Sequence, residues 1–97
     1  MELIIKDLDF TNGHVQVSSD GQVKSKNGEW SKGFFNGEFY EIDIKFVNGL
    51  NREVIQTYLV HNLLAYAFFG NNACERVINH KNWDKLDNRI YNLEISY

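Results

Sequence analysis

The sequence contains no proline, a single cysteine and no long apolar run, and these shortages narrow the class of protein. Cys74 has no partner for an internal disulfide, which favours the reducing cytoplasm of a host cell. No stretch reaches the roughly 18 apolar residues of a membrane-spanning helix, so we expect no membrane partner. The opening residues, MELIIK, lack the basic start and the apolar core of a secretion signal. Because repeats and linker-like tracts are also missing, we expect a single domain over residues 1–97.

Apolar and aromatic residues, by contrast, are plentiful. They make up 43% and 14% of the 97 residues, which is enough for a packed core and excludes a disordered chain. The formal net charge of −3 argues against strong non-specific binding to nucleic acid, because domains that grip phosphates are usually basic. A local basic patch stays compatible with this charge.

The first half of the chain, residues 1–57, has the pattern of a β-rich module. Polar and apolar residues alternate with a period of two, as in half-buried strands. The expected strands are residues 14–18, 22–25, 39–47 and 52–59. Turn residues separate them, with Ser19-Asp20-Gly21 in the first hairpin and Asn48-Gly49 in the second. We expect Val15, Val17 and Val23 to point inward. The aromatic cluster of Phe34, Phe35, Phe39 and Tyr40 is expected to be mostly core.

The second half, residues 58–97, begins with an amphipathic helix. Val60, Leu63, Leu64, Ala67 and Phe68 form one apolar stripe, and Gly70 marks the helix end. This stripe predicts a helix packed across the inner face of the second hairpin. A short strand at 76–80 comes next. A polar loop at 81–85, continued by a turn or short helical piece at 87–90, then leads to a final strand at 93–96. The expected fold class is therefore α+β, a small antiparallel β-sheet with one packed helix.

Two segments of the second half resemble the phage and intron-homing type of HNH endonuclease. Residues 60–70, VHNLLAYAFFG, are similar to the segment before the active site, and residues 77–94, VINHKNWDKLDNRIYNLE, resemble the core motif. Upstream, residues 15–25, VQVSSDGQVKS, look like the small β-rich module that commonly precedes this core. The resemblance covers nearly the whole chain and implies an origin in a bacteriophage or another mobile element.

The resemblance implies single-metal phosphodiester hydrolysis, with Mg²⁺ or Mn²⁺ as cofactor. His80 matches the general base that activates water. Asn79 matches the first metal ligand, and Asn92 matches the central asparagine, which braces the loop. Asn88 is expected to cap the same loop. His61 is expected to be packed and hydrogen-bonded, and His14 to face solvent.

Three departures from the family pattern matter, two for the expected metal site and one for a phosphate contact. The chain ends at Tyr97, before the helix that carries a second ligand, so the ββα-metal unit is expected to be incomplete. Asn79 is a neutral donor at a position where a carboxylate would bind the ion better. Trp83 stands where the family often has glycine, and Asn62 where arginine is common.

The polar loop carries the candidate binding residues. Lys81, Lys85 and Arg89 would face the DNA backbone if the family geometry holds, although a solvated surface of mixed charge is an equally good reading. Trp83 is either exposed for binding or folded back onto Phe68 or Phe69, and these alternatives stay open. Cys74 is expected to be a bystander.

Two functions compete. In the one we favour on sequence grounds, the scaffold has lost catalysis, needs no cofactor and inhibits a host protein or nucleoprotein, such as a defence nuclease or a DNA-handling enzyme. In the other, it is a metal-dependent HNH endonuclease that nicks DNA with His80 as general base. A homodimer is compatible with either function.

Overall fold

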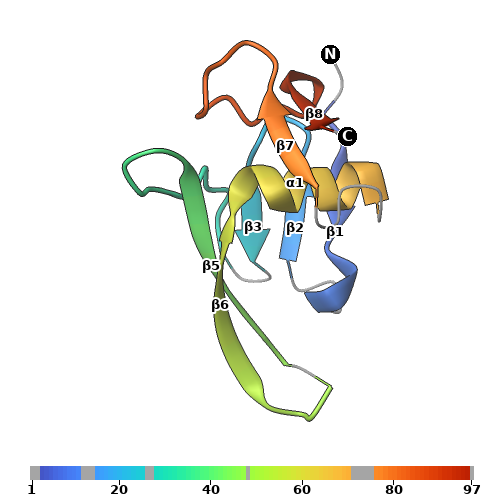
Figure 1. Cartoon of the computed structure of the whole chain (residues 1–97). Helices are drawn as coiled ribbons and strands as arrows, with labels where there is room; N and C mark the ends of the chain where they lie inside the picture. The colour runs from blue at the N-terminus through green and yellow to red at the C-terminus, as the bar shows by residue number, and fades with distance from the viewer. Residues whose placement is uncertain (1–2, 12–14, 26–27, 48, 71–75, 97) are drawn as a thin grey trace.

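The strands pair in three small antiparallel sheets in the computed structural model of the chain, which describes residues 3–11, 15–25, 28–47, 49–70 and 76–96. The first sheet contains β1 (Ile5–Asp7), β2 (Val15–Ser18) and β3 (Val23–Ser25). The second contains β4 (Phe34–Phe35), β5 (Tyr40–Val47) and β6 (Glu53–Leu59). The third contains β7 (Val77–His80) and β8 (Leu93–Ser96), as Figure 1 shows. Helix α1 (Val60–Phe69) and the short 3-10 helices η1 (Asp9–Thr11) and η3 (Ile90–Asn92) complete the described elements.

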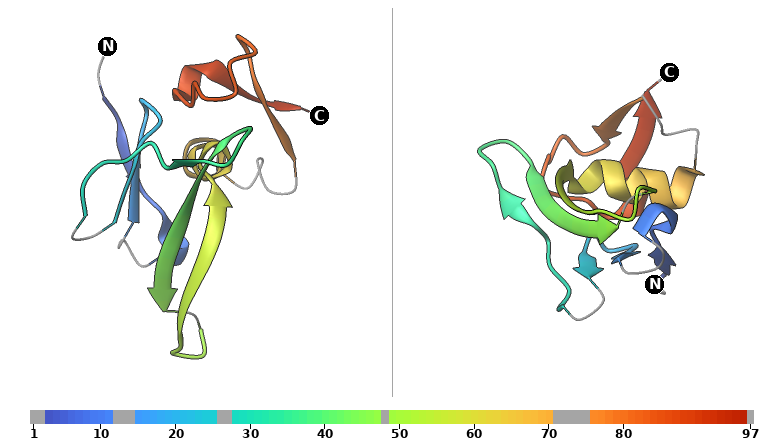
Figure 2. Two further views of the ribbon diagram at one scale, coloured as in Figure 1. Left: turned by 90° about the vertical axis from the view of Figure 1, so that its left-hand side faces the viewer. Right: turned by 90° about the horizontal axis from the view of Figure 1, so that it is seen from below.

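Helix α1 lies at the centre and packs against strands of all three sheets. Figure 2 (left) shows it nearly end-on, with the sheets arranged around it. Its apolar stripe explains this position, because Val60, Leu63 and Leu64 are all buried. At the predicted end of the helix, the backbone N–H of Gly70 donates to the carbonyl of Tyr66, with φ at 70°. The predicted helix is confirmed, and it packs on more of the fold than the second hairpin alone.

The first sheet forms as its alternating pattern predicts. Val15, Val17 and Val23 are at most 2% exposed, so the predicted inward face is confirmed. Strand β1 was not predicted, because residues 3–5 are an unbroken apolar run followed by Lys6 rather than an alternation. It pairs with β2 at an edge of the sheet, where its three residues are exposed. Leu8, just after β1, is fully buried.

The β5–β6 hairpin is the longest ribbon of the fold and extends away from α1 (Figure 1). Its register, for example Ile44 opposite Gln56, follows the predicted period of two, and Ile44 is buried. The predicted Asn48-Gly49 turn includes Asn48, which lies outside the described residues. The predicted aromatic core cluster is wrong for Phe34 and Phe35, which are 68% and 59% exposed, whereas Tyr40 packs against the core. Phe34 and Phe35 form β4, a two-residue strand at the edge of the sheet, with little of the core beside it.

The third sheet positions the candidate site. Strands β7 and β8 pair antiparallel, with Asn79 opposite Glu94 and His80 opposite Leu93. Ile78 and Leu93 are buried, and both strands contact α1. The α+β class is confirmed, although the strands divide into three sheets. In the described part of the chain, no helix is long and apolar enough to cross a membrane. The predictions for His14 and Cys74 concern residues outside the described ranges.

Candidate active site

His80 is the last residue of β7 and is 9% exposed. Its Nε2 lies 2.8 Å from Oδ1 of Asn88. An amide oxygen can only accept a hydrogen bond, so Nε2 must carry the proton and donate it. In the neutral imidazole the second ring nitrogen, Nδ1, is then unprotonated and able to accept a proton. The arrangement of a base oriented by a second group is one that general-base chemistry requires.

Asn88 packs against the turn between β2 and β3 of the first sheet. It is 4% exposed, and a Cβ on Gly21 would lie only 2.8 Å from its carbonyl carbon. Gly21 has a φ of +93°, a conformation that L side chains rarely adopt. Nearby, the N–H of Ile90 donates to the carbonyl of Ser19 over 2.9 Å. The β-rich module therefore supports the residue that orients His80.

Asn92 lies where the bracing asparagine was predicted and connects both ends of the polar loop. Its Nδ2 donates to Oδ1 of Asn82 over 2.9 Å and to the carbonyl of Asp87 over 2.8 Å. Its Oδ1 accepts from the backbone N–H of Asn82 over 3.1 Å. Because Asn92 is also buried, these bonds hold residues 82–87 in one conformation.

His61 and Phe39 complete an aromatic cluster around His80. The ring centroids of His61 and His80 are 5.1 Å apart in an edge-on arrangement, and Phe39 lies 4.8 Å from His61 and 6.2 Å from His80. His61 is packed as predicted, but its Nδ1 has no hydrogen-bond partner among the described residues, and neither has Nδ2 of Asn88. Burial first, and the neighbouring His80 second, lower the pKa of His61 to about 4.

The lowered pKa of His61 predicts a loss of stability in mild acid. The unfolded chain binds a proton at His61 near pH 6.5, whereas the folded chain resists it down to about pH 4. The His61 contribution is fully present above pH 6.5 and is lost as the pH falls toward 4, with a total of roughly 3 kcal/mol. Urea unfolding between pH 4 and 7 measures it. The His61→Gln variant should show a flatter pH dependence, and an unchanged slope would contradict this assignment.

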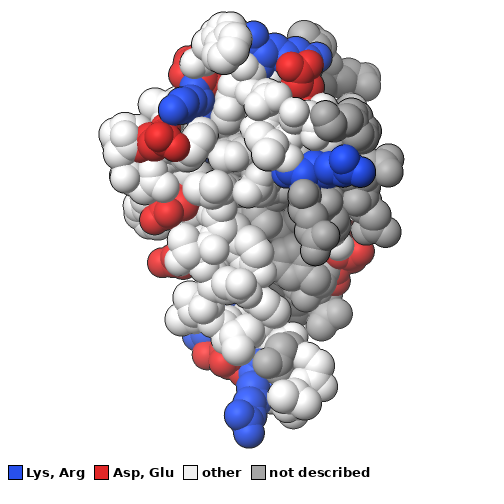
Figure 3. Space-filling model, viewed as in Figure 1, with Lys and Arg blue, Asp and Glu red and all other residues white. Residues whose placement is uncertain are grey.

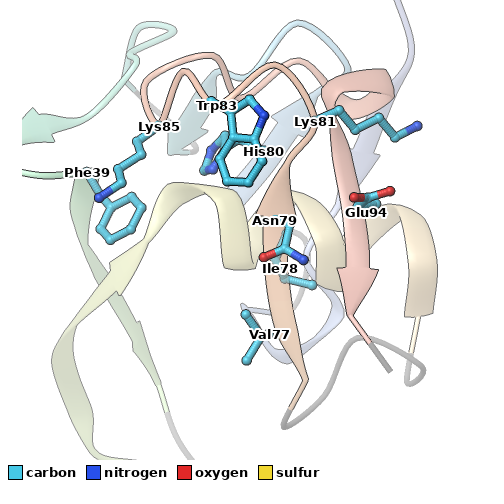
Figure 4. Close-up of a pocket in the computed structure, with 9 residues that line it drawn as sticks. All are labelled: Phe39, Val77, Ile78, Asn79, His80, Lys81, Trp83, Lys85 and Glu94. Atoms are coloured by element: carbon cyan, nitrogen blue, oxygen red, sulfur yellow. The ribbon is translucent and has the colours of Figure 1, made fainter.

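A pocket of about 350 Å³ opens beside His80. Figure 4 shows its lining residues, which come from β7, β8, the polar loop and the turn before β5. Asn79 and Glu94 are exposed on neighbouring strands of this pocket. Glu94 was missed by sequence reasoning, because only the β7–β8 register places its carboxylate opposite Asn79. Pairing the two strands from the ends of the polar loop could have found it.

Trp83 is 90% exposed at the rim of this pocket. This exposure excludes the alternative in which the indole folds onto Phe68 or Phe69. The residue has a φ of 66°, which explains why glycine suits the position.

The predicted basic residues do not form one surface. Nζ of Lys85 lies 3.4 Å from Oε2 of Glu38 and 5.3 Å from the ring centroid of Phe39. Arg89 is bound by Asp87, which raises the pKa of Arg89, while the Arg89 hydrogen bonds lower the pKa of Asp87 to about 2. Lys81 lies on the pocket. On the face of the molecule that Figure 3 shows, basic (blue) and acidic (red) side chains are likewise scattered.

Oxygen donors for a divalent ion are few in this pocket. Across the described ranges, no three His, Cys, Asp or Glu side chains gather into a metal-binding group. Directly opposed residues of antiparallel strands have Cβ atoms about 5 Å apart, so the Asn79 amide and the Glu94 carboxylate are within reach of one ion. One carboxylate plus neutral and substrate oxygens is a usual donor set for Mg²⁺. The residues present therefore fit a weak, substrate-assisted site.

Comparison with solved structures finds a protein of similar fold that matches nearly the whole chain. The chain is similar to the HNH homing endonuclease I-HmuI, in a structure that reports DNA binding and cleavage by that enzyme. The identity is 32% and the TM-score 0.77, over 99% of this chain. The chain spans 52% of the length of that endonuclease. No protein-family model matches the chain, and no curated protein does.

Proposed function

Because this chain has the fold of an HNH-type endonuclease, we propose that it binds DNA at the His80 pocket and hydrolyses a phosphodiester bond there. The observation that carries the proposal is the hydrogen bond between Nε2 of His80 and Oδ1 of Asn88. It leaves Nδ1 as the ring nitrogen that can accept a proton, and His80 lines a pocket of about 350 Å³. The solved relative is an enzyme that binds and cleaves DNA, which supports the same substrate class.

In this mechanism His80 takes a proton from the attacking water at Nδ1, and Asn88 keeps the imidazole in the required tautomer and orientation. Phe39 and His61 limit the movement of the ring and shield it from bulk water. Asn79 and Glu94 would hold a divalent ion, which when bound offsets negative charge on the phosphate. The experiment that tests the proposal is nicking of supercoiled plasmid by purified protein with Mg²⁺ or Mn²⁺. Protein that neither binds nor nicks the plasmid contradicts it.

The proposed role of Glu94 as a metal ligand distinguishes an active site from an inactive scaffold. We expect Glu94→Gln to weaken Mn²⁺ binding about tenfold or more, because it removes the one carboxylate opposite Asn79. Asn79→Asp should strengthen binding, because it adds a second carboxylate. Titration of the Mn²⁺ electron paramagnetic resonance signal measures both without any need for activity. Glu53→Gln is the matched control, since Glu53 is an exposed carboxylate bound to Lys45 outside the pocket. Equal Mn²⁺ affinity in all four proteins would remove Glu94 from the site.

A second candidate is the binding module favoured by the sequence, directed at a host protein or nucleoprotein. The ion pairs that neutralise Lys85 and Arg89 support it, because they leave little free positive charge for DNA. It predicts no metal-dependent nicking and a stable complex with a host protein. That complex should be lost in Trp83→Ala while the melting temperature changes little. A homodimer stays a prediction, which sedimentation of the purified chain would test.

A further inference from the structure

Trp83 combines two features that rarely occur together, a left-handed backbone and a fully displayed indole. Its φ is 66° and its side chain is 90% exposed. A bulky residue in this region is strained, and strained residues concentrate at functional sites. Nothing in the fold offsets that strain through burial of the ring. The exposure of the Trp83 indole to solvent therefore needs a functional explanation.

The backbone connects Trp83 directly to the candidate base. The N–H of Trp83 donates to the carbonyl of His80 over 3.1 Å, which closes a tight turn between them. The bonds of Asn92 to Asn82 hold the adjoining residue in place. The backbone of Trp83 is therefore fixed one turn away from His80. Its indole lies at the rim of the 350 Å³ pocket, as Figure 4 shows.

The chemistry of the pocket identifies a flat ligand that carries an anionic group. Phe39, Val77 and Ile78 provide apolar wall, and Asn79 offers an amide that can donate and accept. Lys81 lies on the same pocket and makes no ion pair with another described residue. An aromatic platform beside an unpaired cation is the arrangement that binds single-stranded nucleic acid, through stacked bases and attracted phosphates.

We propose that this pocket receives an unpaired nucleobase, stacked on Trp83, while Lys81 contacts the adjoining phosphate. The inference rests on the proposed function and extends it to the state of the substrate, a nucleotide out of its duplex next to the cleaved bond. Glu94 also lines the pocket, from β8, but Figure 4 shows its carboxylate below the Lys81 side chain and apart from the Trp83 indole.

Fluorescence of Trp83 tests this directly. In a Trp30→Phe background Trp83 is the sole tryptophan, since the chain has two. We expect a single-stranded oligonucleotide to quench its emission, and an abasic strand with the same phosphates to leave it nearly unchanged. Trp83→Ala should bind the base-bearing strand about 5- to 100-fold more weakly, the range expected for the loss of one stacked base. Trp83→Phe should stay within a few-fold of the parent, because it keeps an aromatic face.

Stability provides a second measurement that a merely structural role would not reproduce. Trp83→Gly should melt at the same or a higher temperature, because glycine accepts the positive φ, yet it should bind the strand as poorly as Trp83→Ala. Equal affinity for abasic and base-bearing strands would overturn the inference and leave the proposed function standing. Absence of binding to any DNA, duplex or single-stranded, would overturn both.

Discussion

The His80→Ala variant is expected to nick supercoiled DNA about 100- to 10,000-fold more slowly than the parent protein, the usual contribution of a positioned general base. The reason is that Nδ1 of His80 is the proton acceptor that the Asn88 hydrogen bond leaves free. Single-turnover conversion of supercoiled to open-circular plasmid, with Mg²⁺ or Mn²⁺ in excess, measures the rate. DNA affinity should change little, because the lost group acts on water rather than on the duplex.

The controls separate lost chemistry from lost structure. His80 is buried, so circular dichroism and thermal melting must show that the alanine variant still folds. Added imidazole should restore part of the rate by occupying the space that the side chain leaves. Nicking that persists within a few-fold of the parent would show that another group activates the water.

Gly21→Ala is expected to destabilise the fold by roughly 2–4 kcal/mol and to lower nicking as well. About 1 kcal/mol comes from placing a Cβ at positive φ, and the rest from the overpacking of Asn88. Because the new Cβ would lie 2.8 Å from the carbonyl carbon of Asn88, the residue that orients His80 must move. Urea unfolding measures the first effect and plasmid nicking the second.

Gly37→Ala is a matched control for this prediction. Gly37 also has a positive φ, of +104°, but a Cβ there meets nothing within 4 Å. Its variant should lose only about 1 kcal/mol, from backbone strain alone, and should nick at the parent rate. If the two variants behave alike, the contact between the first sheet and Asn88 does not support the site.

Periodicity predicted the elements that carry a clear pattern. Helix α1 and strands β2, β3, β5 and β6 follow from apolar spacing and glycine positions, within one residue at most ends. Strands β1 and β4 could not be found in this way, because each is short, lies at an edge and takes its conformation from the strand beside it. Phe34 and Phe35 were misplaced for a related reason. Apolar character predicts burial only where the fold has a core to offer, and an outlying edge strand has none.

Local sequence patterns likewise predicted only some residues of the candidate site. The motif predicted the positions of His80, Asn79 and Asn92, since these residues lie within one short segment of sequence. Phe39 and Glu94 reach the pocket through contacts and strand register that no local pattern records. Asn88 was predicted to cap the loop, whereas its side chain binds His80. A hydrogen bond between two particular side chains depends on tertiary placement.

The central position of α1 has a consequence for the order in which the chain folds. Strands β1 to β3 precede the helix and can pair while the chain is being synthesised, and the β5–β6 hairpin follows by local closure. The face of α1 that β7 and β8 cover has no partner until Leu93 has left the ribosome. The pocket is therefore assembled after the strands and the helix that precede β7 in the chain. A nascent chain stalled within the polar loop would display apolar helix surface and would be a target for chaperones.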